Sequence, residues 1–188
     1  IGGDVVGAAL RHYPKTIDDP SDPFVLLERN AQRTYVAQSG LVGKDGIDTG
    51  ERALYRAEKS FYQLTDQKPL QVALTYADDA SGVSVTKSFY FEPNNHTITV
   101  SYDIYNSGNA TIQLTPFAQL KRDSSPAPVA TDAGMGMQPF LGSATTQPDQ
   151  GFNKFDFDDM ADNPFKADLV GGWIAMLQHY FVSAWVPA

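Results

Sequence analysis

The sequence predicts an all-β protein built as an antiparallel sandwich, with at most short helical turns. Apolar and polar residues alternate through four successive runs between residues 70 and 120, and a period of two is typical of strands with one buried face. Short segments rich in Asp, Asn, Ser, Gly and Pro separate these runs, as expected for turns between antiparallel neighbours. Together they indicate a meander that needs a second sheet to cover its apolar face.

The four runs are the expected strands of that meander: residues 70–76, 83–91, 98–104 and 112–120. In the third run, Thr97, Thr99, Ser101 and Asp103 lie opposite the apolar set, which predicts one face toward a core and the other toward water or a polar layer. Candidate strands for the covering sheet are residues 33–39, 53–64, 140–145 and 155–157, together with part of the C-terminal run.

The C-terminal run, residues 171–187, is apolar and aromatic but too short to cross a bilayer as a helix. Periodicity leaves strands and a full helix both open there, because the large residues also fit one helical face. Residues 161–169 are expected to form a loop or a single turn because Pro164 interrupts them. Residues 121–150 should be a long, mobile connection rich in Gly, Pro and Ser.

Composition is typical of one globular domain over residues 1–188, with 42% apolar and 19% charged residues. The formal net charge of −8 opposes binding to nucleic acid or to an anionic membrane surface. The basic residues are scattered along the chain, and we expect them on a solvated surface. The chain opens at Ile1 without a targeting segment, so either it is cytoplasmic or that segment lies outside the fragment.

Motifs for catalysis or metal binding are not apparent. The three histidines lack metal-site spacing, and the acidic residues 156–162 do not continue as a calcium loop, because Ala161 and Ala167 stand where Gly and Glu would be required. The chain has no cysteine, no nucleophile elbow and no phosphate-binding loop. We therefore expect a protein that is not an enzyme, with no cofactor and no metal ion.

Aromatic residues are the remaining recognition chemistry, with eleven Phe, nine Tyr and two Trp. Most aromatic side chains pack in cores, but a surplus can leave an exposed groove for a partner. The density is highest in the C-terminal region, which motivates a hypothetical set of partner-contact residues: Phe140, Phe152, Phe155, Trp173, Tyr180, Phe181 and Trp185. An edge strand of the sandwich is a second possible contact, through β-augmentation.

The C-terminal run also carries a distinctive sequence motif at residues 171–187, Gly-Gly-Trp-Ile-Ala-Met-Leu-Gln-His-Tyr-Phe-Val-Ser-Ala-Trp-Val-Pro. Shorter motifs precede it in order: Gly2-Gly3-Asp4-Val5, Tyr13-Pro14-Lys15, Gln38-Ser39-Gly40-Leu41, Leu70-Gln71-Val72 and Phe117-Ala118-Gln119-Leu120-Lys121. In these residues the chain resembles the periplasmic domain of bacterial inner-membrane protein insertases of the YidC type, in the YidC/Oxa/Alb family. The resemblance covers nearly the whole chain in one register.

The resemblance implies a β-super-sandwich similar to galactose mutarotase. In this family the C-terminal run passes through the sandwich core, so the resemblance favours strand, helical turn and strand over residues 171–187, with a full helix as the alternative. It also implies a place on the periplasmic side of the inner membrane, within a multi-spanning protein that helps membrane proteins insert and fold, with or without the Sec translocon. The implied partners are SecDF, other Sec components and nascent membrane proteins, with partner docking or transient polypeptide contact as the domain's own role. The alternatives are a mutarotase-like domain that binds or epimerises sugars, to which no residue can be transferred by motif, and a freestanding periplasmic chaperone.

Members of this family carry a strand before the Gly2-Gly3-Asp4 motif and further strands after the final Trp-Val-Pro. The chain starts and stops at those points. The resemblance therefore implies a fragment that lacks the first strand and the C-terminal strands of the family domain.

Overall fold

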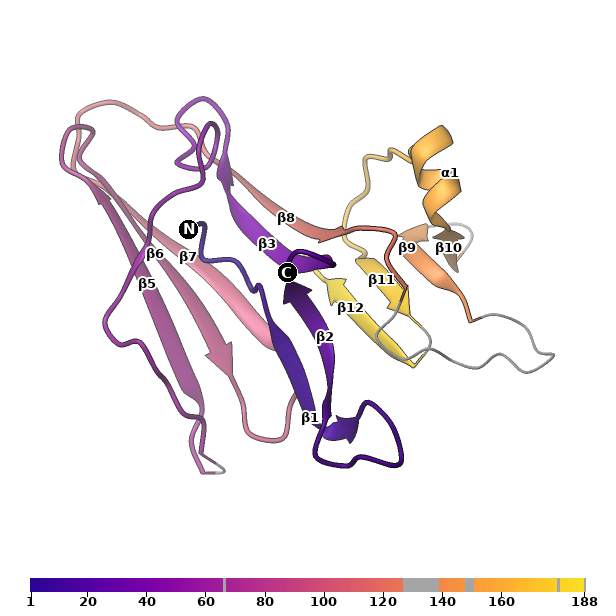
Figure 1. Cartoon of the computed structure of the whole chain (residues 1–188). Coiled ribbons are helices and arrows are strands. Elements are labelled where there is room, and N and C mark those ends of the chain that lie inside the picture. The colour runs from indigo at the N-terminus through magenta and orange to yellow at the C-terminus, as the bar shows by residue number, and fades with distance from the viewer. Residues whose placement is uncertain (66, 127–138, 148–150, 179, 188) are drawn as a thin grey trace. The chain divides into compact units, whose positions relative to one another are not determined.

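The computed structural model describes residues 1–65, 67–126, 139–147, 151–178 and 180–187. Within them the chain forms twelve strands and one short helix, so the prediction of an all-β fold is confirmed. The strands, labelled as in Figure 1, are β1 (Ala8–Pro14), β2 (Pro23–Arg29), β3 (Thr34–Val42), β4 (Arg56–Ala57), β5 (Leu70–Asp78), β6 (Val83–Phe91), β7 (Ile98–Asn106), β8 (Thr115–Arg122), β9 (Leu141–Gln147), β10 (Gly151–Phe155), β11 (Ile174–Gln178) and β12 (Phe181–Trp185). The helix α1 spans Phe157–Asp162.

The strands form three four-stranded sheets, in the orders β1-β2-β3-β8, β4-β5-β6-β7 and β10-β9-β11-β12. The chain divides into two compact units. The first unit comprises Ile1–Asp4 and Ser39–Phe117, and the second comprises Val5–Gln38 and Ala118–Ala188. Strands β3 and β8 each contribute residues to both units. The expectation of one domain over residues 1–188 stays a prediction.

The predicted meander forms the sheet of the first unit. Strands β5, β6 and β7 pair antiparallel over nine residues each, from Leu70 opposite Phe91 to Asp78 opposite Val83 in the first pair. Gly82 and Asn94 adopt positive φ angles of 71° and 56° at the two hairpin ends, a conformation that Gly and Asn tolerate. The fourth predicted strand was wrongly assigned, because β8 joins β3 in another sheet.

The core of the first unit lies against the inward face of β6. Leu41, Val83 and Val85 are buried together, and aromatic and aliphatic side chains from β5, β7 and the neighbouring loops pack around them. Every second residue of β6 from Val83 to Phe89 is buried, as period two requires. Lys87 occupies one position of this row.

The second unit contains the sheet β10-β9-β11-β12. Within it β11 pairs antiparallel with both β9 and β12, from Ile174 opposite Trp185 to Gln178 opposite Phe181. The C-terminal run is thus a β-hairpin, and the alternative of a full helix is wrong. The predicted helical turn would fall on residues 179–180; residue 179 lies outside the described residues, and Tyr180 is a turn residue, so this part stays a prediction. Leu27, Tyr35 and Met176 form the buried centre of this unit, so side chains from β2 and β3 pack on β11.

Two further element predictions were wrong. Of residues 53–64 only Arg56 and Ala57 form a strand, and residues 155–157 mark the end of β10 and the start of α1. The helix begins there because Asp156 caps it. The Asp156 side chain accepts a hydrogen bond from the Asp159 backbone, and the Asp159 side chain accepts one from the Asp156 backbone.

Two strands of the structure were not predicted, and part of one predicted segment lies outside the described residues. Strands β1 and β2 were not predicted, although they pair from Ala8 opposite Leu27 to Pro14 opposite Pro23. Of the predicted connection over residues 121–150, residues 127–138 and 148–150 lie outside the described residues, while residues 141–147 form β9. Among the described residues, no helix has the length and hydropathy to span a membrane.

Candidate functional site

The second unit contains an open groove of about 790 Å³, which we call the apolar groove. It is lined by parts of β8, β9 and β11, by segments between residues 164 and 173, and by Trp185. Its lining is mostly aliphatic and aromatic, and of the described lining residues only Lys166 is charged. A groove of this composition can accept apolar side chains of a partner.

Three of the seven predicted contact residues line the apolar groove: Phe155, Trp173 and Trp185. Phe155 stacks on Phe165, with ring centroids 5.3 Å apart. The Trp185 indole nitrogen donates a hydrogen bond of 3.1 Å to the Gln119 carbonyl, which fixes its ring at the groove. The chain has two tryptophans, so both of them are groove residues.

The other four predicted residues lie around or away from the groove. Phe152 is 53% exposed and contacts Trp173, with centroids 6.2 Å apart. Tyr180 is 84% exposed, Phe140 lies beneath the Lys154 ammonium, and Phe181 stacks on Phe24. The structure therefore brings together part of the predicted set, while Phe181 belongs to the packing between β12 and β2.

Local backbone geometry places Trp173 beside β9. Gly171 and Gly172 have φ angles of 76° and 96°, which L side chains rarely adopt. A Cβ on Gly172 would lie 2.2 Å from Thr146 Cγ2, so glycine is required for the close approach to β9. The Trp173 carbonyl then accepts hydrogen bonds from the Thr146 amide and the Thr145 hydroxyl, at 3.2 and 3.1 Å.

The described residues of the groove lining include neither a histidine nor a carboxylate, so they offer no pair of groups for acid–base chemistry. In the described part of the chain, no three His, Cys, Asp or Glu side chains are close enough to hold a metal ion.

A buried polar cluster that the sequence did not reveal occupies the first unit. The Lys87 side chain is 0% exposed, and its ammonium donates hydrogen bonds to the carbonyls of Gly2 and Ser39, at 3.0 and 2.9 Å. Arg52 forms ion pairs with Asp4 and Asp48. We call these six residues the buried lysine cluster; it fixes the N-terminal segment against β6.

We expect Lys87 to make the stability of the chain depend on pH. Burial lowers the Lys87 pKa from its ordinary value of 10.5 to about 8, so between these values the unfolded chain binds more protons than the folded chain. The free energy of unfolding should therefore rise by about 2 kcal/mol from pH 8 to pH 10. Above pH 10 the gain ends, because burial raises the Tyr102 pKa to about 12 and the unfolded chain loses its tyrosine protons first.

Urea titrations at intervals of pH would measure this dependence. The variant Lys87→Met keeps the length of the side chain but has no titrating group, and its free energy of unfolding should be flat over the same interval. A variant that retained the full slope would show that Lys87 is not its origin.

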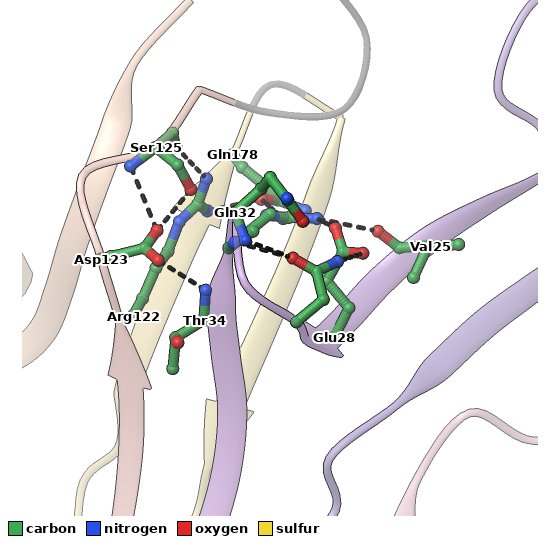
Figure 2. Close-up of polar contacts among 10 residues, drawn as sticks. Val25, Glu28, Gln32, Thr34, Arg122, Asp123, Ser125 and Gln178 are labelled. Atoms are coloured by element: carbon green, nitrogen blue, oxygen red, sulfur yellow. Dashed lines mark hydrogen bonds and ion pairs between the residues drawn. The ribbon is translucent and has the colours of Figure 1, made fainter.

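A second polar cluster lies in the second unit. Gln178, which is 1% exposed, accepts hydrogen bonds at its side-chain oxygen from the guanidinium groups of both Arg33 and Arg122. Figure 2 shows Arg122 and Gln178 meeting at this point, with Glu28 on the opposite side. Glu28 forms an ion pair with Arg33, in which Glu28 Oε1 lies 2.6 Å from Arg33 Nη1. We call Arg33, Arg122 and Gln178 the arginine–glutamine cluster.

These clusters correct the expectation that the basic residues form a solvated surface. Arg33 is 5% exposed and Lys87 is fully buried, and burial lowers the Arg122 pKa. The signal for Lys87 was available, since it stands at an inward position of the β6 alternation between Val85 and Phe89. No comparable signal marks Arg33 or Arg122, because Gln178, the acceptor that they share, is distant from both in the sequence.

Comparison with known proteins gives consistent matches over the whole chain. A family model described as the YidC periplasmic domain matches residues 1–188. The chain is 45% identical over 190 residues to the membrane protein insertase YidC of Marinomonas sp. (strain MWYL1), and 42% identical over 192 residues to that of Alcanivorax borkumensis. The match to the Shewanella piezotolerans insertase is 43% over 189 residues. All of this chain is covered in each case, but only 34%, 33% and 34% of these relatives, so it spans about a third of their length.

Proposed function

Because this chain belongs to the family of YidC periplasmic domains, we propose that it is the non-catalytic, polypeptide-contacting part of a membrane protein insertase. The predicted periplasmic location agrees with the family. The observation that carries the proposal is the apolar groove, in which three of the predicted contact aromatics meet, both tryptophans among them. The occupant that fits this lining is an extended, apolar segment of a nascent membrane protein.

The size of the groove supports a transient contact. A volume of about 790 Å³ holds a few apolar side chains, not a folded partner. Each fully buried Leu or Phe side chain contributes about 1.5–3 kcal/mol, and much of this is offset by ordering an extended segment. Binding in the micromolar range or weaker follows, so that a segment can be held and then released to the membrane.

The rival function, sugar binding or epimerisation, has less support. A sugar site needs polar groups that converge on hydroxyls, and an epimerase needs an acid and a base. Neither a carboxylate nor an imidazole is found among the groove-lining residues that the structure describes. Docking to SecDF or another Sec component is a further proposal that rests on the family resemblance alone.

Replacing groove aromatics should weaken binding of an apolar peptide. We expect the double variant Phe165→Ser, Trp173→Ser to bind a peptide of alternating leucine and serine at least tenfold more weakly, because two apolar contacts are lost. Fluorescence anisotropy of the labelled peptide measures the affinity. In the unchanged chain, tryptophan emission should shift to shorter wavelength on binding, since both indoles line the groove.

Tyr105→Ser is the matched control, because Tyr105 is a strongly exposed aromatic residue of the first unit. This variant should bind as the unchanged chain does. Equal losses in the control and the double variant, or a peptide that binds without changing tryptophan emission, would contradict the proposal. Thermal unfolding of each variant separates lost contact from lost fold.

A further inference from the structure

A smaller polar pocket, of about 290 Å³, lies in the second unit beside the arginine–glutamine cluster. Strands β2, β3 and β8 and the residue after β8 provide its lining: Arg29, Thr34, Val36, Gln38, Lys121, Arg122 and Asp123. Three cationic side chains therefore face one carboxylate. This is an excess of positive charge on a chain whose formal net charge is −8.

The one carboxylate of the pocket is already occupied. Asp123 accepts hydrogen bonds from the Thr34 amide and from the amide and hydroxyl of Ser125, as Figure 2 shows. Burial raises the Asp123 pKa, but the hydrogen bonds from Ser125 and Thr34 and the charge of Arg122 lower it further, so it lies below its ordinary value. Asp123 thus remains ionised, with its oxygens held by neighbouring donors rather than by the three cations.

The guanidinium of Arg122 has a hydrogen-bond donor that is not used by the described residues. Its terminal nitrogens donate to the amide oxygen of Gln178 and, at 3.3 Å, to the Ser125 carbonyl. Its Nε atom is buried and has no hydrogen-bond partner among the described residues. Within the same part of the chain no carboxylate lies at ion-pair distance from Arg122, whereas neighbouring Arg33 has Glu28. The charge of Asp123 acts on Arg122 from beyond ion-pair distance, so this half-buried guanidinium can bind a further carboxylate or phosphate when one is supplied.

We propose that this pocket, the basic pocket, binds the carboxylate of an acidic side chain on a polypeptide partner. Its volume admits a single side-chain group, and the planar guanidinium of Arg122 matches a carboxylate with two donors. A membrane surface is the less suitable occupant, since adsorption to anionic lipid requires several exposed cations on a chain that is not itself strongly acidic. The net charge of −8 would repel such a surface while three local cations still select one carboxylate.

The basic pocket is independent of the apolar groove, because their linings share no residue. An acidic peptide without apolar residues should therefore bind and leave the tryptophan emission unchanged. Failure of one proposal would not affect the other.

Nuclear magnetic resonance titration of the 188-residue chain tests the proposal. The probe is the peptide acetyl-Gly-Glu-Gly-Glu-Gly-amide, and its counterpart with glutamine in place of glutamate is the neutral reference. We expect amide shifts at Thr34 and at Lys121 to Asp123 with the acidic peptide only, weakening as sodium chloride rises from about 50 to about 500 mM. Equal shifts with the glutamine peptide would overturn the proposal.

Arg29 and Lys121 are the exposed cations at the rim of the basic pocket, so replacing them should alter peptide binding without affecting the fold. Arg29→Gln and Lys121→Gln should each weaken the acidic peptide about two- to fivefold, as expected for an exposed charge contact. Arg11→Gln is the matched control, an exposed arginine on neighbouring strand β1 outside the pocket, and should have no effect. Equal losses in all three variants would overturn the proposal.

Two further probes separate the sources of an anion. Inorganic phosphate should bind more weakly than the peptide, and vesicles of phosphatidylcholine and phosphatidylglycerol in equal parts should not bind the chain. Tighter binding of phosphate, or rim-dependent binding of the vesicles, would overturn a polypeptide carboxylate as the ligand.

Discussion

Replacing Asp48 by alanine should lower the free energy of unfolding by about 3–5 kcal/mol, because it removes a carboxylate that three buried donor atoms share. The Asp48 side chain is fully buried. It accepts hydrogen bonds from the amides of Leu41 and Ala53, at 2.9 and 3.1 Å, and pairs with Arg52 at 3.2 Å. The variant leaves two amides and a guanidinium without this acceptor in the core of the first unit.

Urea unfolding at neutral pH measures the loss, and two variants bracket it. Asp103→Ala removes an exposed carboxylate of β7 and should change the stability by less than about 0.5 kcal/mol. Asp48→Asn keeps one acceptor oxygen but removes the charge, so its loss should lie between the other two. If Asp48→Ala lowered the free energy of unfolding no more than Asp103→Ala does, the Asp48 carboxylate would not be needed in the fold.

The second large effect is expected at Gln178. The variant Gln178→Leu fills a similar volume but leaves the guanidinium groups of Arg33 and Arg122 without their common acceptor. Hydrogen bonds to charged groups contribute about 1.5–3 kcal/mol each, so a loss of about 3 kcal/mol in the free energy of unfolding follows. Thermal and urea unfolding would measure it.

A variant that adds a negative charge at the same position, Gln178→Glu, is the control for this site. Gln178→Glu places a carboxylate between two arginines of which only Arg33 has an acidic ion-pair partner among the described residues. We expect this variant to be more stable than Gln178→Leu, and to weaken the acidic peptide at the basic pocket because Arg122 then has an internal counter-charge. A Gln178→Glu variant less stable than Gln178→Leu would mean that burial of the charge outweighs both ion pairs.

The sequence predicted the meander well because its information is local. Alternation from Leu70 to Ile104 and turn residues such as Gly82 and Asn94 determine three antiparallel strands without reference to the rest of the chain. The fourth run has the same alternation, yet β8 pairs with β3, a strand about eighty residues earlier. Periodicity identifies a strand but not its neighbour in the sheet, so this error could not be avoided from pattern alone.

The start of helix α1 was marked in the sequence by a capping signal that was interpreted differently. Asp156 and Asp159 stand at the spacing of a capping box, but as acidic residues they were considered only as calcium ligands. The apolar residue Phe157 between them packs toward the core of the second unit. Local capping chemistry therefore explains why α1 begins before the segment in which a turn was expected.

The candidate site was predicted in part. Aromatic density identified Phe155, Trp173 and Trp185, which line the groove, but it could not separate them from Phe181, which stacks on Phe24. The distinction depends on which face of a strand meets which neighbour, and that is a tertiary property. The basic pocket was missed for the same reason, since Arg29 and Arg122 are more than ninety residues apart in the sequence.

The way Lys87 holds the N-terminal segment has a mechanical consequence. The Gly2 carbonyl accepts from Lys87, the Gly2 amide donates to the Ala53 carbonyl at 2.7 Å, and Asp4 pairs with Arg52. Lys87 is the fifth of the nine residues of β6, with β5 and β7 paired on either side. A pulling force applied at Ile1 would therefore enter the first unit at the middle of its central strand rather than at a strand end. Unfolding under such a load is governed by the rate at which these buried contacts break, and strand-by-strand peeling cannot begin until they have broken.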